Sequence, residues 1–313
     1  MSLPRYSVVV PVFNEELVIR ETYTRLRKVM ESLGEPYELI FVNDGSTDRS
    51  QEIITEICRQ DPRVKLINFS RNFGHQIAIT AGMDHASGEA VIVIDADLQD
   101  PPEVIPSMVA KWKEGYEVVY GKRIKRKGEG FFKKFTAALF YRLLQRMTNL
   151  PIPVDVGDFR LLDRKVCQVL KDIREKNRYV RGLVSWAGFK QAAVEYVRDP
   201  RFAGETKYSL KKMLKLAWDG LTSFSHLPLE ISLKVGGILA LGGMAYLLVV
   251  LLVRPAPASL WGNVLLSAMI FLTGVNLFFL GLLGIYVARI YDEARNRPLY
   301  IIASRVGFDE NRT

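Results

Sequence analysis

Cysteine is nearly absent from this chain, which has two in 313 residues. Cys58 and Cys167 are far apart and show none of the spacings that are typical of metal sites. We interpret both as reduced, non-functional thiols in a cytoplasmic domain. The sequence has no internal repeat and no low-complexity segment. Residues 1–13 lack the basic n-region and apolar h-region of a signal peptide, so we expect the amino-terminal part to remain in the cytoplasm.

Charge is missing from two long stretches, residues 235–253 and 255–288. Each supplies the roughly 20 apolar residues that a membrane-spanning helix needs, and Arg254 with two nearby prolines suits a short loop between them. Lysines and arginines precede the first stretch and follow the second, which places both flanks in the cytoplasm. A buried helical hairpin of a soluble protein is the alternative. We predict a multi-pass protein of the inner (plasma) membrane.

Three parts follow from this topology. They are a cytoplasmic domain with juxtamembrane helices over residues 1–228, a two-helix transmembrane hairpin over 229–290 and a cytoplasmic C-terminal tail over 291–313. Residues 131–147 and 210–221 have the basic amphipathic pattern of helices that lie in a membrane interface. The same pattern also fits helices that pack on the soluble domain.

The net charge of +9 fits either nucleic acid or an anionic membrane surface as a partner. Basic residues concentrate at 122–127 and just before the first apolar stretch. This placement favours the membrane and phosphate-bearing lipid, so we predict no nucleic acid partner. Small residues in both apolar stretches allow close helix packing, either within the hairpin or between subunits of a homo-oligomer.

Strands and helices alternate through the amino-terminal part. We expect strands at 6–12, 37–42, 64–69, 90–94 and 118–121, and helices at 17–33, 48–58 and 75–86. This order predicts an α/β, Rossmann-like, mostly parallel sheet with helices on both faces. Ligands of such sheets bind at the carboxyl ends of the strands.

Polar clusters stand at three of those strand ends. A buried apolar run at 91–94 leads directly into Asp95-Ala96-Asp97, and the other clusters are 14–16 and 43–46. Asp95 and Asp97 share one face if the chain is extended, and two carboxylates so close repel each other unless a cation lies between them. Mg²⁺ or Mn²⁺ that also bridges substrate phosphates suits this position. The alternative is an ordinary polar loop, with Asp100-Pro101-Pro102 as a turn and helix start.

Residues 8–15, 42–48 and 95–97 together resemble family 2 glycosyltransferases of the GT-A fold. Residues 70–74, 97–102 and 157–161, with the two apolar stretches, resemble the polyprenyl-phosphate glycosyltransferases more closely. That group includes dolichol-phosphate mannose synthase and bacterial undecaprenyl-phosphate glucosyltransferases. The resemblance implies inverting transfer of one sugar from a nucleotide sugar to polyprenyl (undecaprenyl) phosphate at the cytoplasmic membrane face. UDP-glucose is the first choice of donor, and GDP-mannose or a UDP-N-acetylhexosamine is the alternative.

The resemblance also implies a donor site. The base and ribose pocket is lined by Pro11, Phe13, Glu15 and Asp44, of which Asp44 hydrogen-bonds the base. Asp97 and Gln99 hold the divalent metal together with the donor diphosphate. Asp95 binds the ribose or the outer shell of the metal.

Asp158 is implied as the catalytic base, with Asp155 as the alternative. We expect Asp158 to lie on a loop, between two prolines and a helix for which Asp163 is the N-cap. An acceptor phosphate is already largely ionised near neutral pH, so Asp158 orients the acceptor or balances charge more than it abstracts a proton. The phosphate-binding cations implied by the resemblance are Lys122, Arg123, Arg201 and Lys207, the first two on a loop over the site.

Two other functions are the alternatives. A processive polysaccharide synthase needs a transmembrane channel, which two spans do not form, and the Gln-x-x-Arg-Trp motif typical of those enzymes is absent. A non-catalytic membrane anchor that binds nucleotide sugars is expected to have lost the site carboxylates. All of them are present here.

Overall fold

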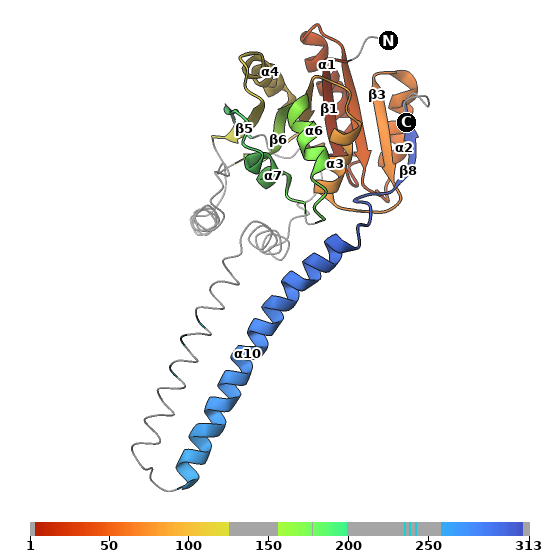
Figure 1. The fold of residues 1–313 in the computed structure, drawn as a ribbon. Coiled ribbons are helices and arrows are strands. Elements are labelled where there is room, and N and C mark those ends of the chain that lie inside the picture. Colours follow the sequence, from red (N-terminus) through yellow and green to blue (C-terminus); the bar gives the residue numbers. More distant parts are fainter. Residues whose placement is uncertain are drawn as a thin grey trace. The chain divides into compact units, whose positions relative to one another are not determined.

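The computed structural model describes residues 4–124, 156–176, 178–198 and 258–308, with the single residues 235, 238 and 242. The chain divides into two compact units (Figure 1). The first comprises Met1–Lys215 and Pro298–Thr313, and the second comprises Leu216–Arg297.

The first unit is built on an eight-stranded sheet with the order β7-β5-β6-β4-β1-β2-β3-β8. The strands are β1 (Tyr6–Val12), β2 (Tyr37–Asn43), β3 (Val64–Phe69), β4 (Ala90–Val93), β5 (Val118–Arg123), β6 (Val156–Asp163), β7 (Gln191–Tyr196) and β8 (Ile302–Val306). The helices of this unit are α1 (Ile19–Ser32), α2 (Ser50–Gln60), α3 (His75–His85), η1 (Pro102–Val104), α4 (Ile105–Lys113), α6 (Arg164–Asp172) and α7 (Val180–Trp186).

Four neighbouring strands, β4, β1, β2 and β3, are parallel to one another. β1, β2 and β4 are buried along their whole length, which is typical of parallel strands covered by helices on both faces. The predicted α/β, Rossmann-like, mostly parallel sheet is therefore confirmed. Helices α1 and α2 each begin two residues later than predicted. For α2 the reason is that the Asp48 side chain accepts a hydrogen bond from the Ser50 backbone N–H at 3.0 Å and ends the loop there.

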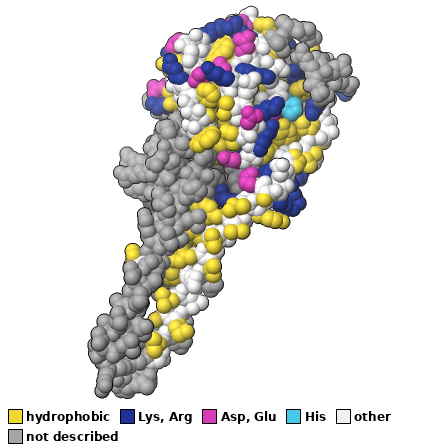
Figure 2. All heavy atoms as spheres, in the orientation of Figure 1, with side chains coloured by type: hydrophobic (Ala, Val, Ile, Leu, Met, Phe, Trp, Pro, Cys, Tyr) yellow, Lys and Arg dark blue, Asp and Glu magenta, His cyan; other side chains and the backbone are white. Residues whose placement is uncertain are grey.

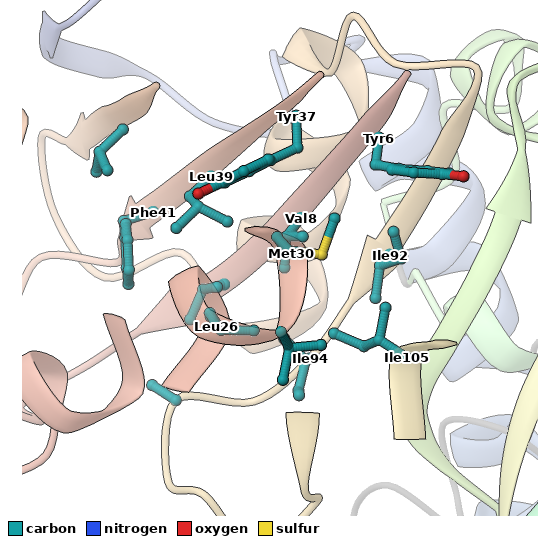
Figure 3. Close-up of a cluster of buried hydrophobic side chains, with 14 of the residues drawn as sticks. Tyr6, Val8, Leu26, Met30, Tyr37, Leu39, Phe41, Ile92, Ile94 and Ile105 are labelled. Atoms are coloured by element: carbon teal, nitrogen blue, oxygen red, sulfur yellow. The ribbon is translucent and has the colours of Figure 1, made fainter. Parts of the chain in front are cut away.

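Helices cover both faces of the parallel strands. On one face, a hydrophobic cluster joins the strands to α1, α2 and α4 (Figure 3). Leu39 of β2 and Leu26 and Met30 of α1 belong to this cluster. On the other face α3 packs on β1, and Gly82 allows the close approach. A Cβ atom at Gly82 would lie 2.1 Å from a methyl carbon of Val9.

Beyond β4 the sheet continues with strands of mixed direction. β6 is antiparallel to both β4 and β5, and β7 is parallel to β5. Val93, the last residue of β4, pairs with Arg160, so the first residues of β6 extend past the end of β4. Lys122 pairs with Val156 and Arg123 pairs with Tyr196, so β5 and β7 end at the same edge. This register brings three further strand ends to the edge where the parallel strands finish.

The prediction of a loop at Asp158 is wrong, because residues Val156–Asp163 form β6. All but the last residue of this strand are buried, including the charged residues Asp158 and Arg160. The sequence does not indicate a buried strand here because charged side chains are rarely buried without partners. Asp163 does cap α6 as predicted, by accepting a hydrogen bond from the Lys165 N–H at 3.0 Å.

β8 pairs antiparallel with β3 and forms one edge of the sheet. Tyr300, just before it, stacks on Phe69 with ring centroids 5.3 Å apart. The Tyr300 hydroxyl donates a hydrogen bond to Asp84 at 2.9 Å. Part of the segment that the sequence assigns to a separate tail, 291–313, is thus the last strand of the first unit.

The second unit contains α10 (Ala258–Ala294), a helix of 37 residues. No helix in the described residues meets the combined requirement of length and hydropathy for crossing a membrane. The two predicted transmembrane helices are therefore not confirmed. The predicted interface helices at 131–147 and 210–221 lie outside the described residues, as does nearly all of the first predicted span, 235–253.

Candidate active site

The loops that follow β1 and β2 are tied together by hydrogen bonds. The Asn14 N–H donates to Ser46 Oγ at 3.0 Å, and the Thr47 N–H donates to the Asn14 side chain at 2.8 Å. Asn14 has a positive φ of 54°, a conformation that asparagine adopts more readily than most residues. The Glu15 N–H donates to Ser50 Oγ at 2.9 Å. The two loops therefore form one rigid rim at the carboxyl edge of the sheet.

Three of the predicted pocket residues lie on this rim or beside it. Pro11 is buried within β1, opposite Val42 of β2. Phe13 and Glu15 follow the end of β1, and Phe13 is 37% exposed. Part of the Phe13 side chain is therefore exposed beside the strand ends. Their roles in nucleotide binding remain predictions.

Asp44 is buried and its carboxylate is surrounded by donors from the loop after β3. It accepts hydrogen bonds from the Phe73 N–H at 2.7 Å, the Gly74 N–H at 3.0 Å and the Asn72 side chain at 2.9 Å. Burial raises the pKa of Asp44, against the opposing effect of these backbone N–H groups. In this structure Asp44 fixes the 72–74 loop. Its predicted hydrogen bond to the base remains a prediction.

Gly45 brings the same two loops into contact. Its φ is +68°, and a Cβ atom there would lie 2.6 Å from the Arg71 carbonyl carbon and from the Asn72 nitrogen. We expect Gly45→Ala to lower the free energy of unfolding by about 2–3 kcal/mol, from backbone strain plus displacement of the loop. Urea unfolding of the purified protein measures this.

Gly34→Ala is the matched control, since Gly34 has a φ of +67° and nothing within 4 Å of the added atom. It introduces the strain alone, at a cost of about 1 kcal/mol. Equal losses in the two variants would show that the contact with the loop after β3 contributes nothing.

Asp95 and Asp97 follow β4 in a turn rather than in an extended strand. The strand ends at Val93, and Leu98 has a positive φ of 57°. Asp97 accepts a hydrogen bond from the Gln99 N–H at 3.1 Å, which closes the turn. The expectation that Asp95 and Asp97 share one face of an extended strand is therefore wrong. The turn still places both at the carboxyl edge, with Asp97 buried.

His75, the first residue of α3, lies between two of the site carboxylates. Its Nε2 atom is 3.4 Å from Asp95 Oδ1 and 3.3 Å from Asp158 Oδ2. Burial lowers the pKa of His75, but the two carboxylates outweigh this effect and raise it to about 9. Burial and the neighbouring carboxylates, against the effect of His75, raise the pKa of Asp95 to about 6. His75 is thus an imidazolium that links the turn after β4 to β6.

Asp158 accepts hydrogen bonds from two further side chains. Arg181 donates from Nε at 2.9 Å and from Nη2 at 3.2 Å, and Gln76 donates at 3.1 Å. Burial favours the neutral acid, but Arg181 and His75 prevail and hold the pKa of Asp158 well below its usual range. A carboxylate so strongly stabilised is a poor proton acceptor. This agrees with a role in balancing charge, although the catalytic assignment itself remains a prediction.

Sequence reasoning did not find His75, Gln76 or Arg181. His75 and Gln76 open α3, whose buried residues are mostly apolar, and Arg181 lies in α7, more than twenty residues after Asp158. The Gln76 side chain also accepts a hydrogen bond from the Val180 N–H at 3.0 Å, which docks α7 against α3. Only the fold brings these residues together.

The predicted phosphate-binding cations differ in where the structure places them. Lys122 and Arg123 are the last residues of β5 rather than part of a loop. Lys122 is exposed and pairs with Glu195 at 2.8 Å, whereas Arg123 is largely buried and pairs with Asp100 at 3.3 Å. The strand extends further than predicted because β7 pairs with it as far as Arg123. Arg201 and Lys207 lie outside the described residues.

The family model described as glycosyl transferase family 2 matches residues 7–170, more than half of the chain. The chain belongs to glycosyl transferase family 2. The predicted family is therefore confirmed, and the protein is a glycosyltransferase. The matched segment contains Asp44, Asp95, Asp97 and Asp158.

Relatives cover nearly the full length of this family 2 glycosyltransferase. An uncharacterized glycosyltransferase of Bacillus subtilis, YkcC, is 60% identical over 98% of this chain and 96% of its own. A prophage-derived bactoprenol glucosyl transferase of Shigella flexneri is 44% identical over 95% of this chain and 97% of its own. A solved glucosyl-3-phosphoglycerate synthase from Mycobacterium tuberculosis, in complex with Mn²⁺, UDP-glucose and phosphoglyceric acid, is 21% identical, with a TM-score of 0.46 over 69% of this chain and 76% of that one.

The turn after β4 of the glycosyltransferase has features that suit a hard cation. Asp95 Oδ1 is buried, and no group in the described residues donates a hydrogen bond to it. The neighbouring carboxylates repel Asp95 in this state. The described residues contain no group of three or more His, Cys, Asp or Glu side chains placed to hold a metal. Mg²⁺ commonly uses one or two carboxylates and takes further oxygens from substrate phosphates and water, so the residues present fit such an ion.

Proposed function

We propose that this family 2 glycosyltransferase transfers glucose from UDP-glucose to polyprenyl phosphate at the cytoplasmic face of a membrane. One observation carries the proposal. His75 contacts both Asp95, in the turn after β4, and Asp158, which pairs with Arg181. This arrangement occurs in a chain that is 44% identical to a bactoprenol glucosyl transferase over 95% of its length. The product is a lipid-linked monosaccharide.

The chemistry needs little from a general base. In the proposed reaction an oxygen of the acceptor phosphate attacks the anomeric carbon, the bond from that carbon to the UDP oxygen breaks and the configuration inverts. Because the acceptor is already an anion, Asp158 has no proton to remove and instead fixes Arg181 and His75. Asp97 and Gln99 would hold a divalent ion, which supplies charge neutralisation for the departing diphosphate.

A transfer assay tests the proposal. Purified protein with Mg²⁺ is given radiolabelled UDP-glucose and undecaprenyl phosphate, and label in the lipid phase is measured. We expect labelled lipid and UDP release only when both substrates are present. GDP-mannose and UDP-N-acetylglucosamine are the comparison donors. Greater transfer from either of these would identify it as the donor in place of UDP-glucose. UDP release in the absence of undecaprenyl phosphate would contradict the proposed acceptor.

We further propose that the enzyme is held at the inner membrane by a helical hairpin over residues 229–290. Two observations support this. Residues 255–288 carry no charge, and side chains of α10 such as Met269, Phe278 and Ile290 are exposed by 65%, 68% and 67%. Figure 2 shows hydrophobic side chains at the surface along this helix. β8 pairs with β3, so the residues before and after the hairpin fold into one sheet. A chain that enters a membrane between them must therefore return to the same side.

This topology predicts a labelling pattern. We expect a cysteine introduced by Ser259→Cys to react with a membrane-impermeant maleimide in intact cells, and one introduced by Ala303→Cys to react only after lysis. Cys58 and Cys167 are buried, and burial raises the pKa of each thiol to about 12, so the wild-type protein is the background control. The reversed pattern would place the site away from cytoplasmic nucleotide sugars and overturn the proposal.

A further inference from the structure

A second cluster of charged side chains surrounds Asp100, three residues beyond Asp97. The Asp100 carboxylate is fully buried. Arg123 Nη2 lies 3.3 Å from its Oδ2 atom and Arg198 Nε lies 3.5 Å from its Oδ1 atom. The Tyr196 hydroxyl donates a hydrogen bond to Oδ1 and accepts one from Arg123 Nε at 3.2 Å. Two guanidinium groups thus converge on one carboxylate.

The surrounding strands are shaped to hold this cluster. Arg123 is the last residue of β5 and pairs in register with Tyr196 of β7, which Arg198 follows by two residues. Gly157 of β6 leaves space for the Arg123 guanidinium, because a Cβ atom there would lie 2.4 Å from Arg123 Nη2. Any larger residue at this position would displace the guanidinium.

The cluster has an excess of positive charge, since one carboxylate faces two guanidinium groups. Arg198 Nε is buried, and no acceptor in the described part of the chain takes a hydrogen bond from it. Each guanidinium has five N–H donors, and the contacts to Asp100 and Tyr196 use only part of them. The side chains of Arg123 and Arg198 are 13% and 30% exposed, whereas that of Asp100 is 1% exposed. The arginines are therefore within reach of a ligand that cannot touch Asp100.

We propose that Asp100 is a positioning residue that orients Arg123 and Arg198 as a pair which binds a phosphate group of a substrate. Paired guanidinium groups match the several oxygens of a phosphate, and a buried counter-ion keeps them in place before the phosphate arrives. The proposal rests on the proposed function, because it is that reaction which brings phosphate to this edge. The phosphate is that of the polyprenyl acceptor or the diphosphate of the donor.

The test measures KM for undecaprenyl phosphate and for UDP-glucose separately. We expect Asp100→Asn and Arg198→Ala each to raise one KM by about tenfold and to change the other by less than about twofold, as for loss of a charge-assisted contact. A rise for undecaprenyl phosphate assigns the pair to the acceptor, and a rise for UDP-glucose assigns it to the donor. Because Asp100 acts through both arginines, the double variant should raise that KM by less than the product of the two single-variant changes.

Asp61→Asn is the matched control. Asp61 is also a buried carboxylate, and it accepts hydrogen bonds from Arg63 Nε at 2.8 Å and from the Tyr23 hydroxyl at 3.0 Å. It precedes β3, at the opposite edge of the sheet from the site. This variant loses stability in the same way as Asp100→Asn, and both KM values should be unchanged.

Arg198→Ala keeps the test decisive if Asp100→Asn does not fold, since Arg198 is partly exposed. Unchanged KM values in Arg198→Ala, with wild-type protein active, would overturn the phosphate-binding pair. Wild-type protein that transfers no glucose to undecaprenyl phosphate would overturn the proposed function instead.

Discussion

Asp97→Asn is expected to reduce the rate of glucose transfer by about 10³-fold or more. The substitution removes the charge of a buried carboxylate that we propose as a metal ligand, beside Asp95, whose pKa burial and the neighbouring carboxylates raise against the effect of His75. Metal stabilisation of a developing negative charge contributes several kcal/mol, and each 1.36 kcal/mol is a factor of about ten in rate. Transfer kinetics, with calorimetric titration of UDP in the presence of Mg²⁺ or of a chelator, measure the effect. UDP binding should lose most of its dependence on the metal.

Asp163→Asn serves as the control for Asp97→Asn. Asp163 caps α6 and accepts a hydrogen bond from Trp112 Nε1 at 2.8 Å. Asparagine caps a helix about as well as aspartate, so this substitution should cost little stability. The rate and the metal dependence should stay at the wild-type level. Wild-type rates and metal dependence in Asp97→Asn would require the metal assignment to be abandoned.

Asp158→Asn is expected to lower both activity and stability. It leaves Arg181 and His75 without the carboxylate that they share, and loss of one partner from a buried charge pair typically costs about 3 kcal/mol. The folded-state pKa of Asp158 is depressed, so its contribution to stability is present above the unfolded pKa of about 4 and is lost as pH falls through the folded value. The stability difference between wild type and variant should therefore be largest between about pH 5 and 6.5 and shrink in more acidic solution. It should also shrink above about pH 6.5, because the raised pKa of His75 depends in part on Asp158. Urea unfolding across this pH range measures the difference.

Asp84→Asn is a control that distinguishes the loss of activity in Asp158→Asn from its loss of stability. Asp84 pairs with Arg174 at 2.9 Å and accepts a hydrogen bond from Tyr300, away from the site. Its substitution should lower stability and leave the kcat of the folded protein unchanged. If Asp158→Asn lost activity without losing stability, and the wild-type rate showed a titration near neutral pH that the variant lacked, Asp158 would be a conventional general base.

The parallel half of the sheet was predictable because each of its strands can be recognised from its own local sequence pattern. Residues 6–12 and 64–69 are apolar runs with clear boundaries, and the structure gives the same limits for β1 and β3. The sequence does not indicate β6 because Asp158 and Arg160 interrupt its apolar pattern. The partners that stabilise the buried Asp158 carboxylate, Arg181 of α7 with His75 and Gln76 of α3, come from other elements. β8 is separated from its partner β3 by more than two hundred residues, so no local pattern indicates the pairing.

The position of the site in the fold was predictable, but the contacts between its side chains were not. The carboxylates follow strand ends, which a parallel sheet brings to one edge, and so the sequence indicates Asp44, Asp95 and Asp97. It does not reveal that the 72–74 loop supplies the donors around Asp44, or that a histidine lies between Asp95 and Asp158. These contacts depend on the register of β6 and on the placement of α3, which are properties of the assembled sheet.

The position of β8 also sets the order in which the chain can fold during synthesis. The ribosome completes β1 to β7 first. While residues 199–297 are synthesised, the edge of β3 that pairs with β8 is unpaired. An open edge strand is a template for pairing with other chains. Nascent chains that stall before Ile302 should therefore be prone to aggregation and to degradation by quality-control proteases. The complete sheet can therefore form only after the whole of the second unit, Leu216–Arg297, has been synthesised.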